Sequence, residues 1–335
     1  MLRGKFELII SRTPLRVSLF GGGTDMPEFY EEFGGAILSF PINKYVYVTS
    51  HRSFDSSFRL AYSEVEVRQN LHEIRNPIIR ECLVENQPEG FLEITSIADV
   101  PANGTGLASS SAFTISVLSV LKAMTGEPHD QVKLAEDAFH IERNKIGDPV
   151  GKQDHYGTAL GGLKFLEFER SGRVLINKIE TSEDIMEGLF SNLLIVYTGA
   201  TRSAKKLLLE QQKSIKSRSA IRKYIDSLDF AYQANELIIQ GNYEAVGRLL
   251  SKAWESKKGY YSNISTPFVD QIISTGIKAG AFGGKLLGAG TGGFVLFFAP
   301  RKFHEGILSS LKGLKDFPVH LDASGTQIIY KESNE

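Results

Sequence analysis

One short stretch, residues 101–112 with the sequence PANGTGLASSSA, limits the possible folds of this chain more than any other. Its two glycines, Gly104 and Gly106, permit positive φ and close approach of the backbone to another group. The three serines that follow can cap a helix and offer hydroxyl and N–H groups. Residues 112–124 are apolar nearly all round and long enough for about three helical turns, which predicts a buried helix. A glycine-rich loop that leads into such a helix is typical of a phosphate site, the alternative being a flexible turn before a core helix.

Length and composition limit the class of protein. A chain of 335 residues exceeds one ordinary hydrophobic core, so two domains in close contact are expected. A net charge of −1 leaves no excess of basic residues to neutralise phosphate backbones, which argues against a nucleic-acid or membrane-surface partner. Cys82 is the only cysteine, so disulfides and thiolate metal sites are excluded within the chain. We see neither a signal peptide nor an apolar run of the ~20 residues that span a bilayer, and therefore expect a cytoplasmic protein that acts on small molecules.

The predicted elements alternate without the regular rhythm of a doubly wound sheet, which indicates an α+β fold. In the first half, hydrophobic periodicity predicts strands at 8–10, 12–20, 35–40, 44–51, 58–62, 90–96, 161–168 and 173–179, and helices at 27–33, 74–85, 112–124 and 130–145. A polar stretch at 180–184 is the expected boundary between a first domain, residues 1–185, and a second domain, residues 186–335. In the second domain we expect strands at 192–197, 294–299 and 327–330, and helices at 203–240, 243–257, 266–279 and 303–314.

Two further glycine-rich segments do not fit the common nucleotide motifs. The segment GGGTD, residues 21–25, ends a predicted strand, and a hairpin turn is its alternative explanation. In the segment 280–293, Leu286 stands where a P-loop needs Ser or Thr, and Ala279 where it needs its first glycine. The same segment contains the spacing G-x-G-x-x-G, but a predicted strand follows, whereas a dinucleotide-binding fold needs a helix. The chain also has no G-x-S-x-G elbow of a serine hydrolase.

The three glycine-rich segments, in this order, resemble the motifs of the GHMP kinases, the superfamily of galactokinase, homoserine kinase, mevalonate kinase and phosphomevalonate kinase. Residues 13–25 resemble the first motif, residues 101–112 the second, which binds the phosphates of ATP, and residues 285–293 the third. GGGTD and the segment GKQDHY, residues 151–156, look most like the sugar-1-kinase branch, above all its D-glycero-D-manno-heptose 7-phosphate kinases; fucose-type kinases share similar segments. The resemblance implies a two-domain fold, with an N-terminal domain like ribosomal protein S5 domain 2 and a ferredoxin-like C-terminal domain.

Two positions depart from the family pattern. Gly21-Gly-Gly23 stands where many members have Gly-Glu-His, so the sugar contacts that galactokinases make there are missing, which disfavours a galactose-like substrate. Ala108 replaces a glycine common in the second motif. Neither change removes the residues that the family uses for ATP.

The resemblance also implies roles for individual residues. Asp154 matches the catalytic aspartate, which orients or deprotonates the attacking hydroxyl, and Arg16 matches the arginine near it, which would offset charge on the transferring phosphoryl group. Ser110 and Glu142 match the family's Mg²⁺ ligands, and hard oxygen donors suit that ion. On its own, Glu142 would be an ordinary helix carboxylate, Asp154 a loop Asx-turn and Arg16 an outward strand residue. The ATP site would consist of Pro101, Asn103, Gly104, Thr105, Gly106, Leu107, Ala108, Ser109, Ser110 and Ser111.

The expected substrate contacts come from both halves of the chain. They are Gly22, Gly23, Thr24, Asp25, Gly151, Gly290, Thr291 and Gly292. If the substrate carries its own phosphate, Arg202 and Lys205, with Lys206, are candidates to bind it, although a solvated helix face explains these residues equally well.

The leading hypothesis is an ATP- and Mg²⁺-dependent kinase that phosphorylates the anomeric hydroxyl of a sugar. The substrate most in line with the motifs is D-glycero-D-manno-heptose 7-phosphate, converted to the 1,7-bisphosphate during synthesis of nucleotide-activated heptose for surface polysaccharide. Alternatives are a fucose-, galactose-, mevalonate- or homoserine-type kinase, and a non-catalytic sensor of sugar and ATP; a nicotinamide dehydrogenase is disfavoured by the strand after Gly293. The sequence leaves open the sugar, the anomer, the exact part that Asp154 plays, and whether the protein is a homodimer.

Overall fold

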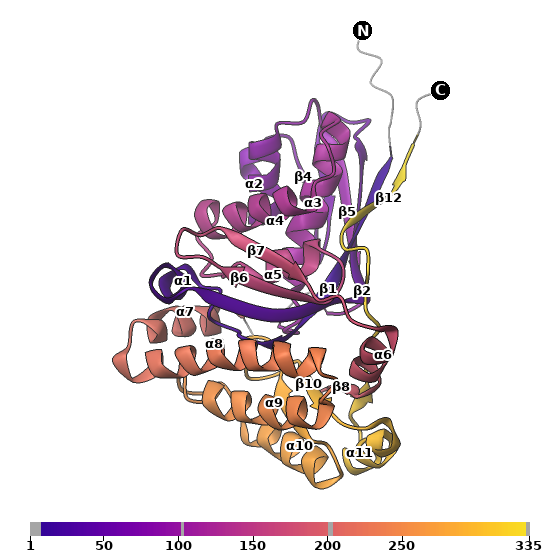
Figure 1. The fold of residues 1–335 in the computed structure, drawn as a ribbon. Helices are drawn as coiled ribbons and strands as arrows, with labels where there is room; N and C mark the ends of the chain where they lie inside the picture. The colour runs from indigo at the N-terminus through magenta and orange to yellow at the C-terminus, as the bar shows by residue number, and fades with distance from the viewer. Residues whose placement is uncertain (1–7, 102–103, 200–203, 333–335) are drawn as a thin grey trace.

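The computed structural model describes residues 8–101, 104–199 and 204–332, which form two β-sheets with helices packed against them (Figure 1). The larger sheet has eight strands in the order β12-β1-β2-β5-β3-β4, and β6 pairs with both β2 and β7. Only β3 and β5 are parallel; the other pairs are antiparallel, as expected for an α+β fold. The strands are β1 (Ile9–Phe20), β2 (Gly35–Arg52), β3 (Phe58–Ala61), β4 (Val65–Arg68), β5 (Leu92–Ala98), β6 (Lys164–Phe168), β7 (Val174–Lys178) and β12 (Gln327–Lys331).

Strands β1 and β2 are each one long strand where the sequence predicts two. The predicted gap between 40 and 44 is a bulge in β2, because the pairing with β1 shifts from Pro14 opposite Tyr45 to Leu15 opposite Ile42. Strand β1 continues through its predicted break: residues 9–14 pair with β2 in unbroken register, and the shift beside Ile10 lies only in the pairing with β12. The residues that interrupt the alternation therefore do not end either strand.

Helices of the first half cover one face of the large sheet (Figure 1). They are α2 (Pro77–Asn86), α3 (Ser109–Thr125), α4 (Gln131–His140) and α5 (Gln153–Ala159), while α1 (Pro27–Phe33) lies beside α7. Helix α3 is buried, as predicted, and its hydroxyls are satisfied in the core: Ser116 donates to Thr13 over 2.7 Å. The helix predicted at 130–145 ends as a π-helical turn, Ile141–Lys145. Within the described ranges, no helix is both long and apolar enough to cross a lipid bilayer.

The smaller sheet has the ferredoxin-like arrangement that the resemblance implies. Its strands β8 (Leu193–Tyr197), β9 (Gly283–Leu286), β10 (Phe294–Phe298) and β11 (Lys315–Asp316) lie in the order β11-β8-β10-β9. Helices α7 (Ala204–Ile215), α8 (Arg218–Ile239), α9 (Tyr243–Lys257) and α10 (Pro267–Lys278) connect β8 to β9, and α11 (His304–Ser310) connects β10 to β11, which gives β-α-β-β-α-β. The stretch 203–240, predicted to be mostly helical, forms two helices, because Ser217 is extended and is the N-cap of α8.

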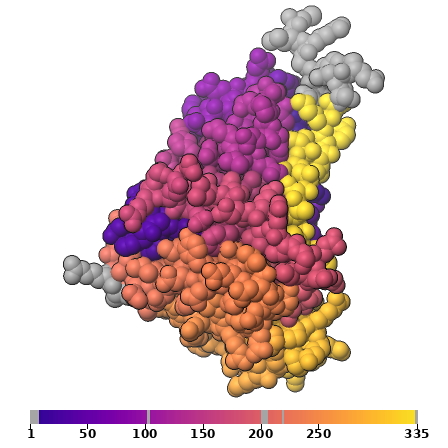
Figure 2. All heavy atoms as spheres, in the orientation of Figure 1, coloured from indigo at the N-terminus to yellow at the C-terminus, as the bar shows by residue number. Residues whose placement is uncertain are grey.

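The division at residue 185 separates the two sheets, but its assignment of the C-terminal strand is wrong. Helix α6 (Glu183–Ser191) occupies the boundary, whereas β12 returns to the large sheet and pairs with the edge of β1. This pairing satisfies backbone groups that would otherwise form an open edge. Figure 2 shows the yellow C-terminal segment lying along the N-terminal part of the molecule. One hydrophobic cluster, which includes Leu15, Phe40, Leu249 and Phe298, contains residues of both parts and so packs them together.

Candidate active site

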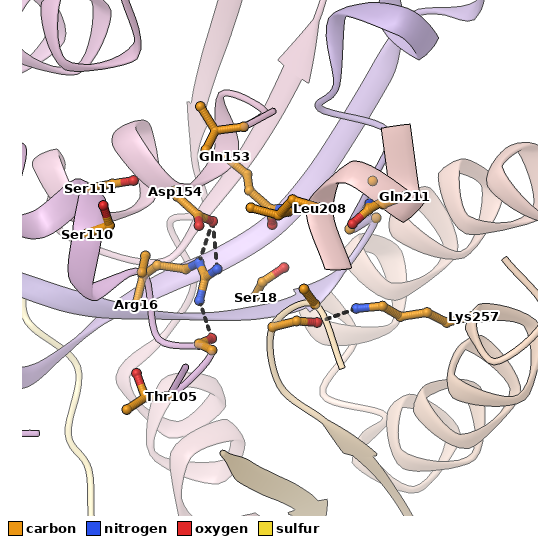
Figure 3. Close-up of a pocket in the computed structure, with 18 of the residues that line it drawn as sticks. Arg16, Ser18, Thr105, Ser110, Ser111, Gln153, Asp154, Leu208, Gln211 and Lys257 are labelled. Carbon is orange, nitrogen blue, oxygen red and sulfur yellow. Dashed lines mark hydrogen bonds and ion pairs between the residues drawn. The ribbon is translucent and has the colours of Figure 1, made fainter. Parts of the chain in front are cut away.

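A cavity of about 610 Å³ lies where the two parts of the molecule meet (Figure 3). Residues from all three glycine-rich segments line it: Arg16 with 18–23, 104–106 with 108–111, and 288–289. The remaining wall comes from Glu142, residues 148–150, Gln153 and Asp154, residues of α7, α8 and α9, and Tyr260 and Lys285. Three segments distant in sequence therefore meet at one cavity, as the resemblance implies.

The second segment forms the start of α3. Gly104 and Gly106 have positive φ, as predicted. The prediction that the serines cap the helix is wrong: Ala108 is the N-cap, in the left-handed conformation with φ 65°, and Ser109 begins the first turn. The N–H groups of a first turn have no partner inside their helix, so the three serines offer them to a ligand.

Most of the predicted phosphate-loop residues line the cavity. Leu107 does not line the cavity. Its side chain is buried in the core, and its carbonyl accepts a hydrogen bond from the backbone N–H of Arg16 over 3.1 Å. Pro101 is exposed and is not part of the cavity wall, and Asn103 lies outside the described residues. The residues that line the cavity are Gly104, Thr105, Gly106, Ala108, Ser109, Ser110 and Ser111.

Arg16 and Asp154, predicted as a pair, are in direct contact (Figure 3). Two guanidinium nitrogens of Arg16, on β1, donate to Oδ1 of Asp154, in the first turn of α5, over 2.6 and 3.1 Å. The third, Nη1, donates to the Gly106 carbonyl over 2.8 Å, which connects the pair to the phosphate loop. Since both bonds to Asp154 use Oδ1, Oδ2 is the oxygen left to accept a substrate hydroxyl. Gly157 leaves room for the arginine: a Cβ there would lie 3.2 Å from Arg16 Cγ.

Glu142 lies in the π-helical turn after α4 and is buried at the edge of the cavity. Its Oε1 accepts a 2.6 Å hydrogen bond from Thr114, one turn along α3 from Ser110. The ring of His155, buried and without a hydrogen-bond partner among the described residues, lies 3.5 Å from the same oxygen. The hydrogen bond from Thr114 thus orients the carboxylate, and the ring of His155 packs beside it.

The donor set fits Mg²⁺. The hydroxyl of Ser110 and the carboxylate of Glu142 are hard oxygen donors on the same cavity wall. In the part of the chain that the structure describes, no group of three or more His, Cys, Asp or Glu side chains could hold a metal. A Mg²⁺ ion held by these two residues would therefore keep positions for phosphate oxygens and water, as Mg²⁺ commonly does.

Three of the expected substrate contacts, Thr24, Asp25 and Gly151, do not line the cavity. The Thr24 hydroxyl is buried and bonds both backbone groups of Ala36. The Asp25 carboxylate is buried and accepts from the backbone of Gly23 and from both the backbone and the side chain of Gln153. Asp25 therefore joins the first glycine segment to the segment that carries Asp154. Gly151 is required by this contact, because a Cβ there would lie 2.0 Å from Asp25 Oδ2. Gly22 and Gly23 do line the cavity.

The environment of Asp25 predicts a pH dependence of stability. Burial, and next the charge of Asp154, raise the pKa of Asp25 from 3.8 to about 6. Because the folded state keeps the proton to higher pH than the unfolded chain, the stability contributed by Asp25 is complete below pH 4 and is lost as the pH rises through 6. We expect the free energy of unfolding of the wild type, relative to Asp25→Asn, to fall by roughly 3 kcal/mol between pH 4 and pH 7 in urea titrations.

Asp25→Asn serves as the reference for the wild type, because the two proteins share all other titrating groups. A difference that instead grows with pH would mean that the hydrogen bonds from Gly23 and Gln153 outweigh burial, and that the pKa of Asp25 is lowered.

The third segment contributes different residues from those expected. Gly288 and Ala289 line the cavity, whereas Gly290, Thr291 and Gly292 do not. Thr291 is buried, and its N–H donates to the Ile264 carbonyl over 2.8 Å, so this part of the loop packs against the chain after α9.

Two lysines of the cavity wall had no predicted role. Lys285, on β9, donates to the carbonyls of Ser18 and Leu19 and so holds the first segment. Lys257 ends α9, and its Nζ donates to the Gly288 carbonyl over 2.6 Å. Its position was visible in the sequence, since Leu250, Trp254 and Lys257 recur at the spacing of one helix face.

None of the basic residues expected to bind a substrate phosphate is placed in the cavity wall by the described part of the structure. Arg202 lies outside the described residues, as does the side chain of Lys205. Lys206 is exposed on α7 and is not part of the cavity wall.

Comparison with known proteins matches residues 70–162 to the GHMP kinases N terminal domain and residues 234–309 to the GHMP kinases C terminal domain, together about half of the chain. A D-glycero-alpha-D-manno-heptose 7-phosphate kinase from Campylobacter jejuni is 28% identical over 327 residues, which cover 91% of this chain and 94% of that protein. An L-fucokinase/L-fucose-1-P guanylyltransferase from Bacteroides fragilis is 27% identical over 335 residues, covering 88% of this chain and 35% of that protein.

Among solved structures, a D-glycero-D-manno-heptose 1-phosphate kinase from Bacteroides thetaiotaomicron superposes with a TM-score of 0.81 at 24% identity, covering 97% of this chain and all of that one. This likeness confirms the expected two-domain α+β fold. Both halves of the chain match the family, its three glycine-rich segments meet at one cavity, and its fold is that of solved members. The chain therefore belongs to the GHMP kinases.

Proposed function

We propose that this protein is an ATP-dependent sugar kinase that phosphorylates an anomeric hydroxyl. The observation that carries the proposal is the Arg16–Asp154 ion pair, which lies in the same cavity as the free first turn of α3 and the Glu142 carboxylate. Phosphoryl transfer needs a phosphate cradle, an oriented hydroxyl and charge stabilisation, and these residues supply all three.

The transfer requires the acceptor hydroxyl to point at the free Oδ2 of Asp154. The hydroxyl oxygen attacks the γ-phosphorus of ATP, the bond from that phosphorus to the bridging oxygen breaks, and ADP leaves with the electron pair. The hydroxyl proton goes to the Asp154 carboxylate. Arg16 orients that carboxylate and offsets negative charge on the transferring group. The first-turn N–H groups of Ser109–Ser111 bind phosphate oxygens.

Ser110 and Glu142 would hold Mg²⁺, which neutralises phosphate charge when bound. Thr114 keeps Glu142 in place for this purpose.

For the acceptor we propose D-glycero-D-manno-heptose 7-phosphate, which gives the 1,7-bisphosphate. Support comes from the heptose 7-phosphate kinase of Campylobacter jejuni, whose similarity extends over nearly all of both chains. The GGGTD segment, which lacks the Gly-Glu-His of many galactokinases, supports the same choice. The similarity to a bifunctional fucokinase makes fucose the competing acceptor.

The test is release of ADP with Mg·ATP across a panel of heptose 7-phosphate, mannose, fucose, galactose and mevalonate. We expect turnover with the heptose phosphate and a product whose new phosphate is on the anomeric carbon, as shown by phosphorus–proton coupling in NMR spectra. Turnover with fucose alone would reassign the acceptor. If no acceptor of the panel causes ADP release although ATP binds, the choice of acceptor is contradicted and a non-catalytic sensor is favoured.

A further inference from the structure

The cavity has two chemically different ends. At one end are the N–H groups of α3, Ser110 and Glu142, which suit the nucleotide phosphates and their metal. At the other end are side chains of the second domain, among them Gln211, Trp254 and Lys257. Figure 3 shows Lys257 and Gln211 on the opposite side of the Arg16–Asp154 pair from Ser110 and Ser111. The reacting hydroxyl must lie beside Asp154, so the rest of the acceptor extends towards Lys257.

Three cationic side chains line the described part of the cavity, and two of them are committed to protein groups. Arg16 bonds Asp154 and the Gly106 carbonyl. Lys285 bonds the carbonyls of Ser18 and Leu19. Lys257 donates to the Gly288 carbonyl and forms an ion pair with no described residue. An ammonium group has three N–H donors, so Lys257 keeps two for a ligand.

Lys257 lies among charges of both signs. Burial, and next the positive charge of Arg16, lower its pKa to about 8, while the negative charges of Asp25 and Asp154 act in the opposite direction. A bound dianion would offset both effects and restore the charged form, since the opposite charge stabilises a cation in a buried site.

Resting on the function proposed above, we propose that Lys257 binds the phosphate group that the acceptor itself carries, and thereby selects phosphorylated sugars over free sugars. In a heptose 7-phosphate, the phosphate and the anomeric hydroxyl lie at opposite ends of the carbon chain. With the hydroxyl at Asp154, the phosphate reaches the end of the cavity formed by α7 and α9. Gln211 and Ser227 also line the cavity and add neutral polar side chains to it.

The test compares Lys257→Gln with the wild type on a matched pair of acceptors, heptose 7-phosphate and the free heptose. Glutamine removes the charge but keeps an N–H donor for the Gly288 carbonyl. We expect kcat/KM for the phosphorylated acceptor to fall about ten- to one-hundred-fold, mainly through KM, because a charge-assisted hydrogen bond is lost. For the free sugar, kcat/KM should change less than about threefold. Lys257→Arg should retain part of the preference, and Lys252→Gln, on the exposed side of α9, should retain all of it.

Each outcome has a definite meaning. Equal losses on both acceptors would overturn the proposal and assign Lys257 to the transferring phosphoryl group or to the Gly288 loop. Unchanged kinetics of Lys257→Gln on heptose 7-phosphate would overturn it while leaving the proposed function intact. A wild type that phosphorylates neither acceptor would instead refute the acceptor chosen in the proposed function. A binding readout separates affinity from chemistry: at the same concentration, heptose 7-phosphate should raise the melting temperature of the wild type more than that of Lys257→Gln.

Discussion

Asp154→Asn should lower kcat by about a thousandfold, within the range by which a positioned general base accelerates proton transfer. The asparagine has the same size, and its Oδ1 can still accept both hydrogen bonds from Arg16. Its amide group then replaces Oδ2 and faces the substrate hydroxyl with N–H donors, where an acceptor is needed. The change thus reverses one hydrogen bond and removes one charge, while the fold of the site is kept. The measurement is the initial rate of ADP release at saturating ATP and sugar phosphate.

Two measurements on the same variant show whether the site is intact. The dissociation constant of Mg·ATP should change little, because the nucleotide phosphates bind at α3, and the melting temperature should stay close to that of the wild type. A variant that binds ATP normally and keeps more than about a tenth of kcat would show that Asp154 neither removes nor orients the proton.

Local chemistry explains which parts of the fold could be predicted. Helix α3 was found because its apolar run is buried on nearly all sides, and the hairpin β6–β7 because its two apolar runs lie close together in the sequence. The pairing of β12 with β1 could not be found. Its residues, Gln327–Lys331, form a strand whose partner lies more than 300 residues away, and nothing in a strand's own pattern states which edge it joins. For the same reason, the sequence did not indicate that β12 returns to the large sheet.

The site shows what glycines do and do not reveal. Each glycine-rich segment indicated that its backbone lies close to another group, but did not indicate whether that group is a ligand or another part of the chain. In the structure, part of this closeness is between the segments: a Cβ on Gly288 would lie 2.4 Å from Gly106 Cα. The prediction for Asp25 failed in a similar way. A polar residue near a cavity can bind a neighbouring loop instead of a substrate, and Asp25 binds Gln153. Arg16 and Asp154 were found only through the resemblance, since a single strand arginine and a single loop aspartate are common.

Arg16→Gln should lower kcat by about a hundredfold, because the variant loses the group that orients the Asp154 carboxylate towards the acceptor hydroxyl. It should also lower the free energy of unfolding by about 1–3 kcal/mol, because Asp154 and the partly buried Gly106 carbonyl lose their donors. Arg16→Lys is the matched variant: it keeps the charge, but one ammonium group cannot reproduce the planar fork that spans both partners. We therefore expect an intermediate kcat from Arg16→Lys. Chemical denaturation and ADP release, measured on both variants, separate the two effects.

The double variant Arg16→Gln/Asp154→Asn tests whether the two residues act as one unit. If Arg16 works mainly by orienting Asp154, its removal costs little once the carboxylate is gone, and kcat of the double variant should lie within about tenfold of Asp154→Asn alone. If Arg16 acts directly on the transferring phosphoryl group, the two losses multiply. The geometry favours the first result, because two of the three guanidinium hydrogen bonds go to Asp154 Oδ1 and the third goes to a backbone carbonyl. Multiplied losses would contradict this assignment and would make Arg16 a direct ligand of the phosphoryl group in transit.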